Sequence, residues 1–428
     1  MGGSDQHTFS RYSMIPKQEI LSIAKTTSLL PTTVEKDYVL SWILYAVSKN
    51  TRLVEWMFKG GTCLKKCYFE TYRFSEDLDF TVPKGAIYDL VSIKEALNEI
   101  ATFLYQETGI DIKVNTIEVE ESKNKNNAKT FAAKFGYVGP LHNASRAMAR
   151  IKFDITDDEV IADLPEMRAV FHSYSDAPVA PVRVKCYSLN EILAEKTRAM
   201  YEREGRARDV YDVVNIGRNF REDVDRPKAH TCLQEKFKFK GLPEPTVENI
   251  IARINPDLLK ANWNDQLSHQ LPVLPPVESF LNDLHSELSW WIDAGDVGQP
   301  LHTIQGAGGE EVLPRVHFPT VQGVYARNLG IGRKVSSILG PTDWGANIDL
   351  IRYAARNRLY ATFDYKGVRR FVEPYSLRRP STGNLLLYVY EVRKGDGPGG
   401  GIKAFKINEI SNVTITQEVF NPKYTIEL

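Results

Sequence analysis

The chain has 428 residues, 43% of them hydrophobic, and its 54 Lys and Arg residues balance its 54 Asp and Glu residues. A chain of this length can bury sizeable hydrophobic cores and predicts two or three domains. Its apolar runs are short and interrupted by charge, and its first residues form no apolar signal region. These features exclude a membrane-spanning class and predict a cytoplasmic protein with no membrane partner.

The neutral total hides an uneven distribution of charge. From residue 297 onward there are 17 Lys and Arg against 11 Asp and Glu, so this part is basic and the preceding part is acidic. A basic excess of this size is typical of a soluble surface, and it also leaves room for a polyanionic ligand.

The first part of the chain predicts two helices followed by a glycine turn. Apolar residues recur at helical spacing over residues 16 to 49, and the pattern breaks at the Pro-Thr-Thr segment 31 to 33. A predicted strand then runs into KGGT, residues 59 to 62. Glycines at 60 and 61 let backbone N–H groups approach a phosphate closely, and the Thr62 hydroxyl and a following helix N-terminus add donors.

A second motif follows at residues 73 to 80, RFSEDLDF. Asp77 and Asp79 alternate with Leu78 and Phe80, so a strand would place both carboxylates on one face. Magnesium prefers oxygen ligands and is usually held by one or two carboxylates together with substrate phosphates. Fourteen residues separate Thr62 from Asp77, and we interpret this spacing as a longer first helix.

The next region predicts a small mixed sheet with helices. A helix near 89 to 107 leads to strands near 111 to 120, 129 to 137 and 149 to 155. The order strand, Gly-Gly-Thr turn, helix and Asp-x-Asp strand resembles the polymerase-beta-like nucleotidyltransferases. In those enzymes a third carboxylate on a neighbouring strand completes the metal site, and Asp154 is the candidate here. The alternative is an ordinary exposed strand residue.

Residues 188 to 213 predict a well-marked helix followed by a charged motif. Ser188 and Glu191 form a capping box at the helix start. Lys196 is expected near the buried face, where a lysine needs an anionic partner. A triphosphate fits that requirement, and an internal ion pair with Asp209 is the alternative.

The four cysteines include no Cys-x-x-Cys spacing. Cys63 and Cys67 are expected one helical turn apart, and we interpret them as core thiols rather than a zinc site.

The C-terminal part predicts a helical region and then a β-rich domain. Residues 214 to 293 look helical, with Trp263, Trp290 and Trp291 packing a bundle, and the Gly- and Pro-rich stretch 295 to 314 is typical of a linker. A helix near 347 to 357 precedes strands at 361 to 365, 369 to 374, 385 to 392 and 402 to 410, with a mobile loop at 395 to 401. Short strands with regular turns predict a small barrel.

Six motifs in order over roughly residues 15 to 290 resemble the AbiEii/AbiGii nucleotidyltransferase toxin family. They are VEKDY (34–38), KGGT (59–62), RFSEDLD (73–79), KFDI (152–155), EK (195–196) and RARDVYD (206–212). The resemblance implies a phosphate-binding turn, magnesium ligands, a lysine on the nucleotide phosphates and an essential acid. The nucleotide-binding residues it indicates are Lys59, Gly60, Gly61, Thr62, Arg73, Ser75 and Lys196. The metal ligands it indicates are Asp77, Asp79 and Asp154. The catalytic residues it indicates are Asp77, Asp79, Asp154, Lys196 and Asp209.

The family consists of toxins of abortive-infection and type IV toxin–antitoxin systems, some of which transfer nucleotides onto tRNA. The resemblance therefore implies a Mg²⁺-dependent nucleotidyltransferase that uses a nucleoside triphosphate. It does not fix the acceptor, for which the 3′ end of tRNA is the first candidate, and a cognate antitoxin is a candidate partner. Two alternatives remain: a non-catalytic nucleotide or nucleic-acid sensor, and an enzyme that modifies a protein hydroxyl.

The β-rich end resembles the WYL domain, an Sm-like ligand-sensing module of defence-associated proteins. The defining Trp-Tyr-Leu triplet is replaced here by the leucines 385 to 387. The ligand residues indicated are Tyr360, Tyr365, Arg370 and Lys406, and a structural or dimerising barrel is the alternative. The predicted architecture is thus α+β, with a nucleotidyltransferase core at 1–214, a helical bundle at 215–294, a linker at 295–335 and a WYL-like barrel at 336–428.

Overall fold

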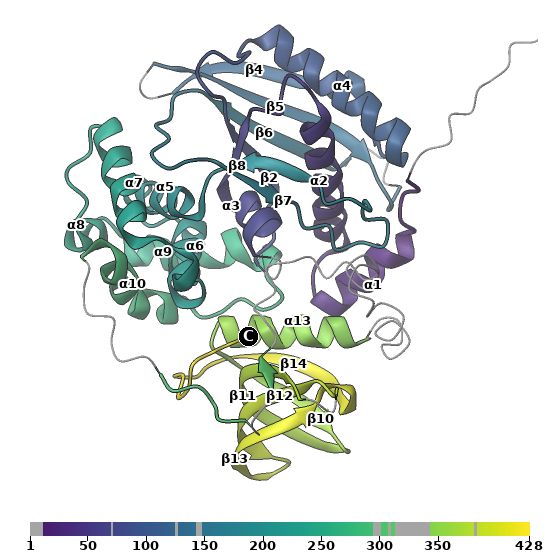
Figure 1. Ribbon diagram of the computed structural model, residues 1–428, viewed down its shortest axis with the longest axis vertical. Coiled ribbons are helices and arrows are strands. Elements are labelled where there is room, and N and C mark those ends of the chain that lie inside the picture. The colour runs from purple at the N-terminus through teal and green to yellow at the C-terminus, as the bar shows by residue number, and fades with distance from the viewer. Residues whose placement is uncertain are drawn as a thin grey trace, which may run out of the picture.

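The computed structural model describes residues 12–69, 72–124, 127–142, 148–293, 301–306, 310–312, 343–380 and 383–428. A mixed sheet with flanking helices forms one part, and a second, antiparallel sheet lies beyond helix α13 (Asp343–Arg356) (Figure 1). The α+β class predicted from the sequence is therefore confirmed.

The first sheet has eight strands in the order β3-β5-β6-β2-β1-β8-β7, with β4 paired to β5. Parallel pairs (β2 with β6, β1 with β8) occur beside antiparallel ones, so the sheet is mixed. The strands are β1 (Met57–Lys59), β2 (Asp77–Thr81), β3 (Asp111–Ile112), β4 (Glu118–Lys123), β5 (Lys129–Val138), β6 (Arg150–Thr156), β7 (Glu166–Ala169) and β8 (Arg183–Cys186).

Two sequence predictions for this sheet need correction. The strand predicted over 111 to 120 is broken into β3 and β4 by the 3₁₀ turn η2 (Val114–Thr116). Strands β7 and β8 were not predicted, because each has only four residues and too few alternations to show a period of two.

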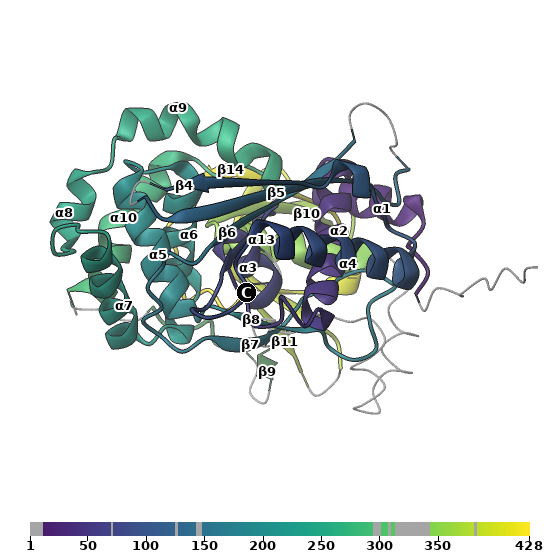
Figure 2. The ribbon, with the colours of Figure 1, turned by 90° about the horizontal axis from the view of Figure 1, so that it is seen from above.

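Helices α2 (Pro31–Lys49) and α4 (Leu90–Thr108) pack beside the sheet, and α1 (Lys17–Thr27) packs on α2 (Figure 2). Pro31 begins α2, where its missing N–H costs nothing and its fixed φ suits the first helical turn. Most of α2 is buried, including Trp42 and the carboxylate of Asp37, which pairs with Lys66 at 2.6 Å. The VEKDY motif therefore anchors the core of the described structure.

The longer first helix predicted after the glycine turn is wrong. Helix α3 (Gly60–Cys63) continues as one π-helical segment, η1 (Leu64–Tyr68), and ends there. The described residues from 72 to 76 are not helical and lead directly into β2. The additional residues between Thr62 and Asp77 thus include a non-helical segment that places Arg73 and Ser75 behind the glycine turn.

A group of six helices lies on the other side of the sheet from α1, α2 and α4 (Figures 1 and 2). Trp263, Trp290 and Trp291 are buried within it, as predicted, and the Trp263 indole N–H donates to the Pro275 carbonyl at 2.8 Å. The helices are α5 (Leu189–Glu202), α6 (Ala207–Asn219), α7 (Arg226–Phe239), α8 (Val247–Ala252), α9 (Pro256–Leu267) and α10 (Val277–Ile292), with short 3₁₀ turns η3 (Arg221–Asp223) and η4 (Ser268–Gln270).

The second sheet is antiparallel with the order β13-β12-β11-β10-β14, and β9 pairs with β11. Its elements are β9 (Glu311–Val312), β10 (Leu359–Tyr365), β11 (Val368–Arg379), β12 (Leu386–Lys394), β13 (Gly397–Lys406), the 3₁₀ turn η5 (Ile407–Glu409) and β14 (Ile410–Val419). The mobile loop predicted at 395 to 401 is wrong, because β13 already pairs with β12 from Gly397. The strand predicted over 402 to 410 ends at Lys406, and β14 follows η5.

Helix α13 joins the second sheet to the first part of the chain (Figure 1). The Tyr353 hydroxyl donates to the Val273 carbonyl at 2.6 Å, and the Tyr211 hydroxyl donates to the Asn357 side chain at 3.2 Å. Within the predicted linker, the Ile304 carbonyl accepts from Arg378 at 2.6 Å and β9 joins the second sheet; residues 295–300, 307–309 and 313–335 lie outside the described residues. No helix among the described residues combines the length and the apolar composition that a membrane span requires.

Candidate active site

The two aspartates of β2 lie on one face of the strand, as the period of two predicted. Asp77 and Asp79 are partly exposed, while Leu78 and Phe80 between them are buried. Asp79 lies opposite Lys59 of β1 and opposite Asp154 of β6 in the strand register. Neighbouring strands are about 4.8 Å apart, so these three side chains are neighbours across the sheet.

The electrostatic environment of Asp79 disfavours its charge in the free protein. Burial, followed by the nearby Asp154 carboxylate, raises the pKa of Asp79 to about 6, although the Lys59 and Lys196 cations act in the opposite direction. Asp154 is held by Lys152 at 2.5 Å. In the described structure, the carboxylate oxygens of Asp77, Asp79 and Asp154 do not all lie within 4.8 Å of one another. A cation between them would relieve their mutual repulsion.

The glycine turn lies directly against this carboxylate. Gly60 has φ +78°, a conformation that favours glycine, and a Cβ there would lie 2.2 Å from Asp79 Oδ2. A Cβ on Gly61 would lie 2.5 Å from Arg73 Nη2 and 3.2 Å from Ser75 Oγ. The Thr62 hydroxyl is buried and donates to the Asp77 main-chain carbonyl at 2.5 Å. The turn and the aspartate strand are therefore held together as one unit.

We predict that Gly60→Ala lowers the nucleotide-transfer activity expected from the sequence by at least about tenfold. It should also lower the free energy of unfolding by about 1–3 kcal/mol, because the methyl group displaces Asp79 and alanine is strained at this positive φ. Gly85→Ala is the matched control, since Gly85 has φ +86° and a methyl group added there would have no other atom within 4 Å. Urea unfolding and initial rates measure both effects. Equal losses in the two variants would show that the contact with Asp79 is irrelevant.

Lys59 is buried and its ammonium is held from the helical side of the site. It pairs with Glu195 at 3.1 Å and with Glu159 at 3.8 Å. Burial acts to lower the pKa of Lys59, but the Glu195 carboxylate and its neighbours outweigh it and raise that pKa. Lys59 is thus a fixed cation beside Asp79, and its predicted contact with nucleotide remains a prediction.

Lys196 lies in a buried cluster of charges between α5 and α6. Its ammonium is 3.1 Å from Asp209 and 2.9 Å from Asp212, so the internal ion pair considered from the sequence is present and has a second carboxylate. Asp212 also accepts hydrogen bonds from both Nε and Nη2 of Arg73, at 2.7 and 2.6 Å. Burial would raise the pKa of Asp212, but Arg73 and Lys196 lower it to about 2.

Asp212, Glu195 and Gln270 are the site residues that the sequence reasoning did not select. Gln270 accepts from Arg73 Nη1 at 2.8 Å, which leaves Arg73 fully engaged by protein groups behind Gly61. Asp209 and Asp212 are three residues apart on α6, and this spacing on a helix places two side chains on one face. That signal could have identified Asp212, whereas Gln270 comes from a distant turn with no motif.

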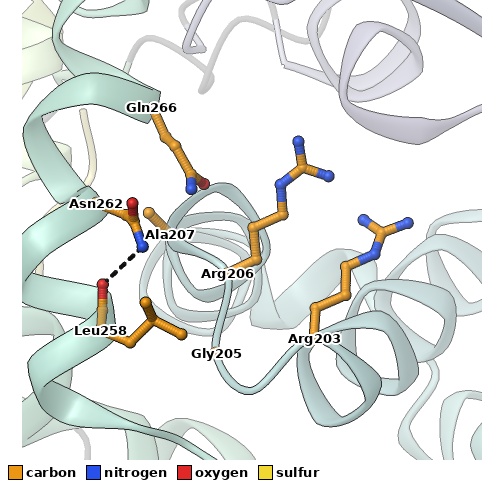
Figure 3. A pocket seen from close by; sticks show the side chains of 7 residues that line it. All are labelled: Arg203, Gly205, Arg206, Ala207, Leu258, Asn262 and Gln266. Atoms are coloured by element: carbon orange, nitrogen blue, oxygen red, sulfur yellow. Dashed lines mark hydrogen bonds between the residues drawn. The ribbon is translucent and has the colours of Figure 1, made fainter.

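A cavity of about 230 Å³ lies at the start of α6, where Ala207 is one of its lining residues. Its lining includes Arg203, Arg206, Asn262 and Gln266, and Figure 3 shows both guanidinium groups extending toward the same side. Arg203 lies 3.3 Å from Asp209. Burial and the neighbouring Arg208 and Arg203 cations lower the pKa of Arg206. This rim carries positive charge that the nearby carboxylate only partly offsets.

The four residues predicted for a WYL-like ligand site are only partly brought together. Tyr360 stacks on Phe371 at 4.6 Å between ring centroids. Tyr365 packs on Phe405, whose ring also lies 5.7 Å from the Arg370 guanidinium. Arg370 is paired with the buried Glu391 at 2.8 Å, and Lys406 with Glu409 at 3.6 Å.

These features define the class of protein. A mixed sheet presents aspartates from adjacent strands beside a glycine turn, and a lysine–aspartate cluster closes one side, as in a nucleotidyltransferase. The family model described as nucleotidyl transferase AbiEii toxin, type IV TA system, matches residues 42–291, and the chain belongs to that family.

A comparison with solved structures finds similarity to MenT4, a nucleotidyltransferase toxin from Mycobacterium tuberculosis H37Rv. The sequence identity is 18% and the TM-score 0.44, over 65% of this chain and 90% of that one. A search of curated proteins gave no match.

Proposed function

We propose that this protein transfers a nucleoside monophosphate from a nucleoside triphosphate to an acceptor hydroxyl, the 3′ end of tRNA, as the toxin of a phage-defence toxin–antitoxin system. Membership of the AbiEii family supports the nucleotidyltransferase activity and a cognate antitoxin as partner. The observation that carries the chemistry is Asp79, which contacts the glycine turn and lies in register with Asp154.

Each group of site residues has its own role in the proposed reaction. The acceptor oxygen forms a bond to the α-phosphorus while the bond to the β-phosphate oxygen breaks, and pyrophosphate leaves. The backbone of Gly60 and Gly61 positions the triphosphate, and Asp154 accepts the proton of the attacking hydroxyl. Lys196 exchanges part of its pairing with Asp209 for the triphosphate, and its positive charge stabilises the transition state.

Mg²⁺ is the proposed cofactor, and the donor set fits it. Asp77, Asp79 and Asp154 are carboxylates on adjacent strands, and the pKa of Asp79 is raised to about 6 by burial and by these neighbours, which a divalent cation would reverse. These three residues would hold the ion, and when bound it supplies charge neutralisation on the phosphate oxygens.

The basic rim at Arg203 and Arg206 is the proposed contact for the acceptor's phosphates. Arg206→Ala is expected to raise the KM for tRNA several-fold with little change in kcat, because a phosphate contact contributes binding rather than chemistry. Arg253→Ala, which removes an exposed cation from the same group of helices, is the control. Steady-state kinetics at two salt concentrations measure this. A loss in kcat at unchanged KM would contradict it.

One assay separates the proposal from its alternatives. The protein is incubated with each labelled nucleoside triphosphate, Mg²⁺, and either total tRNA or a cell lysate. Label in RNA supports tRNA as acceptor, label in protein supports modification of a protein hydroxyl, and absence of label with measurable nucleotide binding supports a non-catalytic sensor. Omission of Mg²⁺ tests the cofactor directly.

We also propose that the second sheet is a WYL-like sensing module with a small barrel architecture. Support comes from its antiparallel strands and from Tyr365, Arg370 and Phe405, which gather at one end of β10 and β11. Calorimetric titration with a short oligonucleotide, compared between the wild type and Lys406→Ala, tests a ligand role against a structural or dimerising one.

A further inference from the structure

Three of the four cysteines converge behind the glycine turn. Cys63 ends α3, Cys67 lies one turn later in η1, and Cys186 ends β8. All three are buried free thiols, and their sulfur atoms all lie within 4.8 Å of one another. The sequence could suggest only the first pair, because Cys186 reaches it through the parallel pairing of β8 with β1, in which Cys186 lies opposite Phe58.

We propose that Cys63, Cys67 and Cys186 form a binding site for a thiophilic metal ion, with Zn²⁺ as the ion it accepts. Zinc–thiolate bonds of about 2.3 Å place the sulfurs of a tetrahedral site about 3.8 Å apart, so closure needs only small side-chain movements. Soft thiolate ligands select zinc and copper(I) over magnesium, so this site is chemically distinct from the aspartates of β2. With three protein ligands, a fourth coordination position is left for water or a small exogenous ligand.

A cation lies close to the three cysteines. The Arg168 guanidinium lies 4.4 Å from the Tyr68 ring centroid, and its Nε donates to the Cys67 carbonyl at 3.3 Å. This cation offsets the net negative charge of a zinc ion bound by three thiolates. Binding releases the three thiol protons to solvent.

A cavity lies beside the site in the described structure. A cavity of about 330 Å³ is lined by Cys67, Tyr68, Glu166 and Arg168, among others, so one of the three ligand residues borders open space. Cys63 directly follows Thr62, whose hydroxyl is bonded to the Asp77 carbonyl. A metal bound here would tie the glycine turn to β8 and stabilise it.

Metal binding itself is the measurement, so the outcome does not depend on catalytic activity. Reduced, metal-free full-length protein is titrated with Zn²⁺ against a chromophoric chelator, and with Co²⁺ to detect its thiolate charge-transfer absorption. We expect one equivalent of zinc and a rise in Tm. Cys67→Ala and Cys186→Ala should weaken binding by at least about 100-fold, because each removes a direct ligand. Cys232→Ala, which removes the fourth buried thiol, on α7, should bind as the wild type does.

A second measurement needs no variant and therefore does not depend on the folding of the alanine forms. Wild-type protein is alkylated with and without Zn²⁺, and the modification of each cysteine is followed by peptide mass spectrometry. Protection of Cys63, Cys67 and Cys186 relative to Cys232 supports the site. Absence of stoichiometric zinc binding, equal protection of all four thiols, or a disulfide among the three in place of metal would overturn it.

Discussion

Asp79→Asn is expected to abolish nucleotide transfer while making the metal-free protein more stable at neutral pH. The loss of activity should be at least about 10³-fold in kcat, because the residue is a proposed ligand of the cation that neutralises the phosphates. The gain in stability follows from the raised pKa of about 6, which means that the folded state disfavours the ionised carboxylate. After allowance for its partial exposure, the gain is about 1–2 kcal/mol.

The stability gained by Asp79→Asn is expected to depend on pH. A carboxyl group whose pKa is higher in the folded than in the unfolded state stabilises the fold below its unfolded pKa of about 4, and that contribution is lost as the pH rises through about 6. The wild type in EDTA should therefore lose stability relative to the variant between about pH 4 and about pH 7, and Mg²⁺ should restore it.

Urea unfolding with and without Mg²⁺, together with initial rates, measures both parts of this prediction. Asp111→Asn is the matched control, because Asp111 is in β3, at the far end of the same sheet. Retention of transfer by Asp79→Asn would refute the assignment of the site. The electrostatic explanation would be refuted if the difference in free energy of unfolding between the wild type and Asp79→Asn stayed the same across this pH range.

The motif residues were accessible from the sequence because local patterns specify them. Alternation of Asp77 and Asp79 with Leu78 and Phe80 predicts the face on which the carboxylates lie, and the structure shows that burial pattern. The same holds for Asp154 between Phe153 and Ile155. A helix cap such as Ser188, which accepts from the Glu191 N–H at 3.1 Å, is equally local.

Which side chains contact those residues could not be predicted from the sequence, because these contacts depend on pairing between distant segments of the chain. Gln270 reaches Arg73 across 197 positions of the chain, and Cys186 joins Cys63 only through the register of β8 on β1. The first helix was predicted too long because spacing alone does not distinguish helix from extended chain. The π-helical segment shortens it, and the released residues carry Arg73 to Asp212.

Asp212→Asn is expected to destabilise the protein more than any other single change to the candidate site. Asp212 is fully buried and accepts hydrogen bonds from Arg73 and from the Tyr72 hydroxyl, and it lies 2.9 Å from the Lys196 ammonium. Asparagine at position 212 would leave the Arg73 and Lys196 cations buried with Asp209 as the remaining nearby carboxylate. Removing one partner of a buried ion pair lowers the free energy of unfolding by about 3–5 kcal/mol. Urea unfolding at neutral pH measures this, with Glu99→Gln as the control for a pair exposed to solvent, expected to cost less than about 1 kcal/mol.

The acid limb of the stability curve distinguishes loss of this charge from a simple packing defect. Because Arg73 and Lys196 lower the pKa of Asp212 to about 2, its contribution is present above its unfolded pKa of about 4 and disappears as the pH falls through about 2. The wild type should therefore approach the variant in stability at low pH. A double replacement, Arg73→Met with Asp212→Leu, should recover part of the loss, because it removes the uncompensated guanidinium together with its partner. If the double variant is no more stable than Asp212→Asn, buried charge is not the cause of the destabilisation.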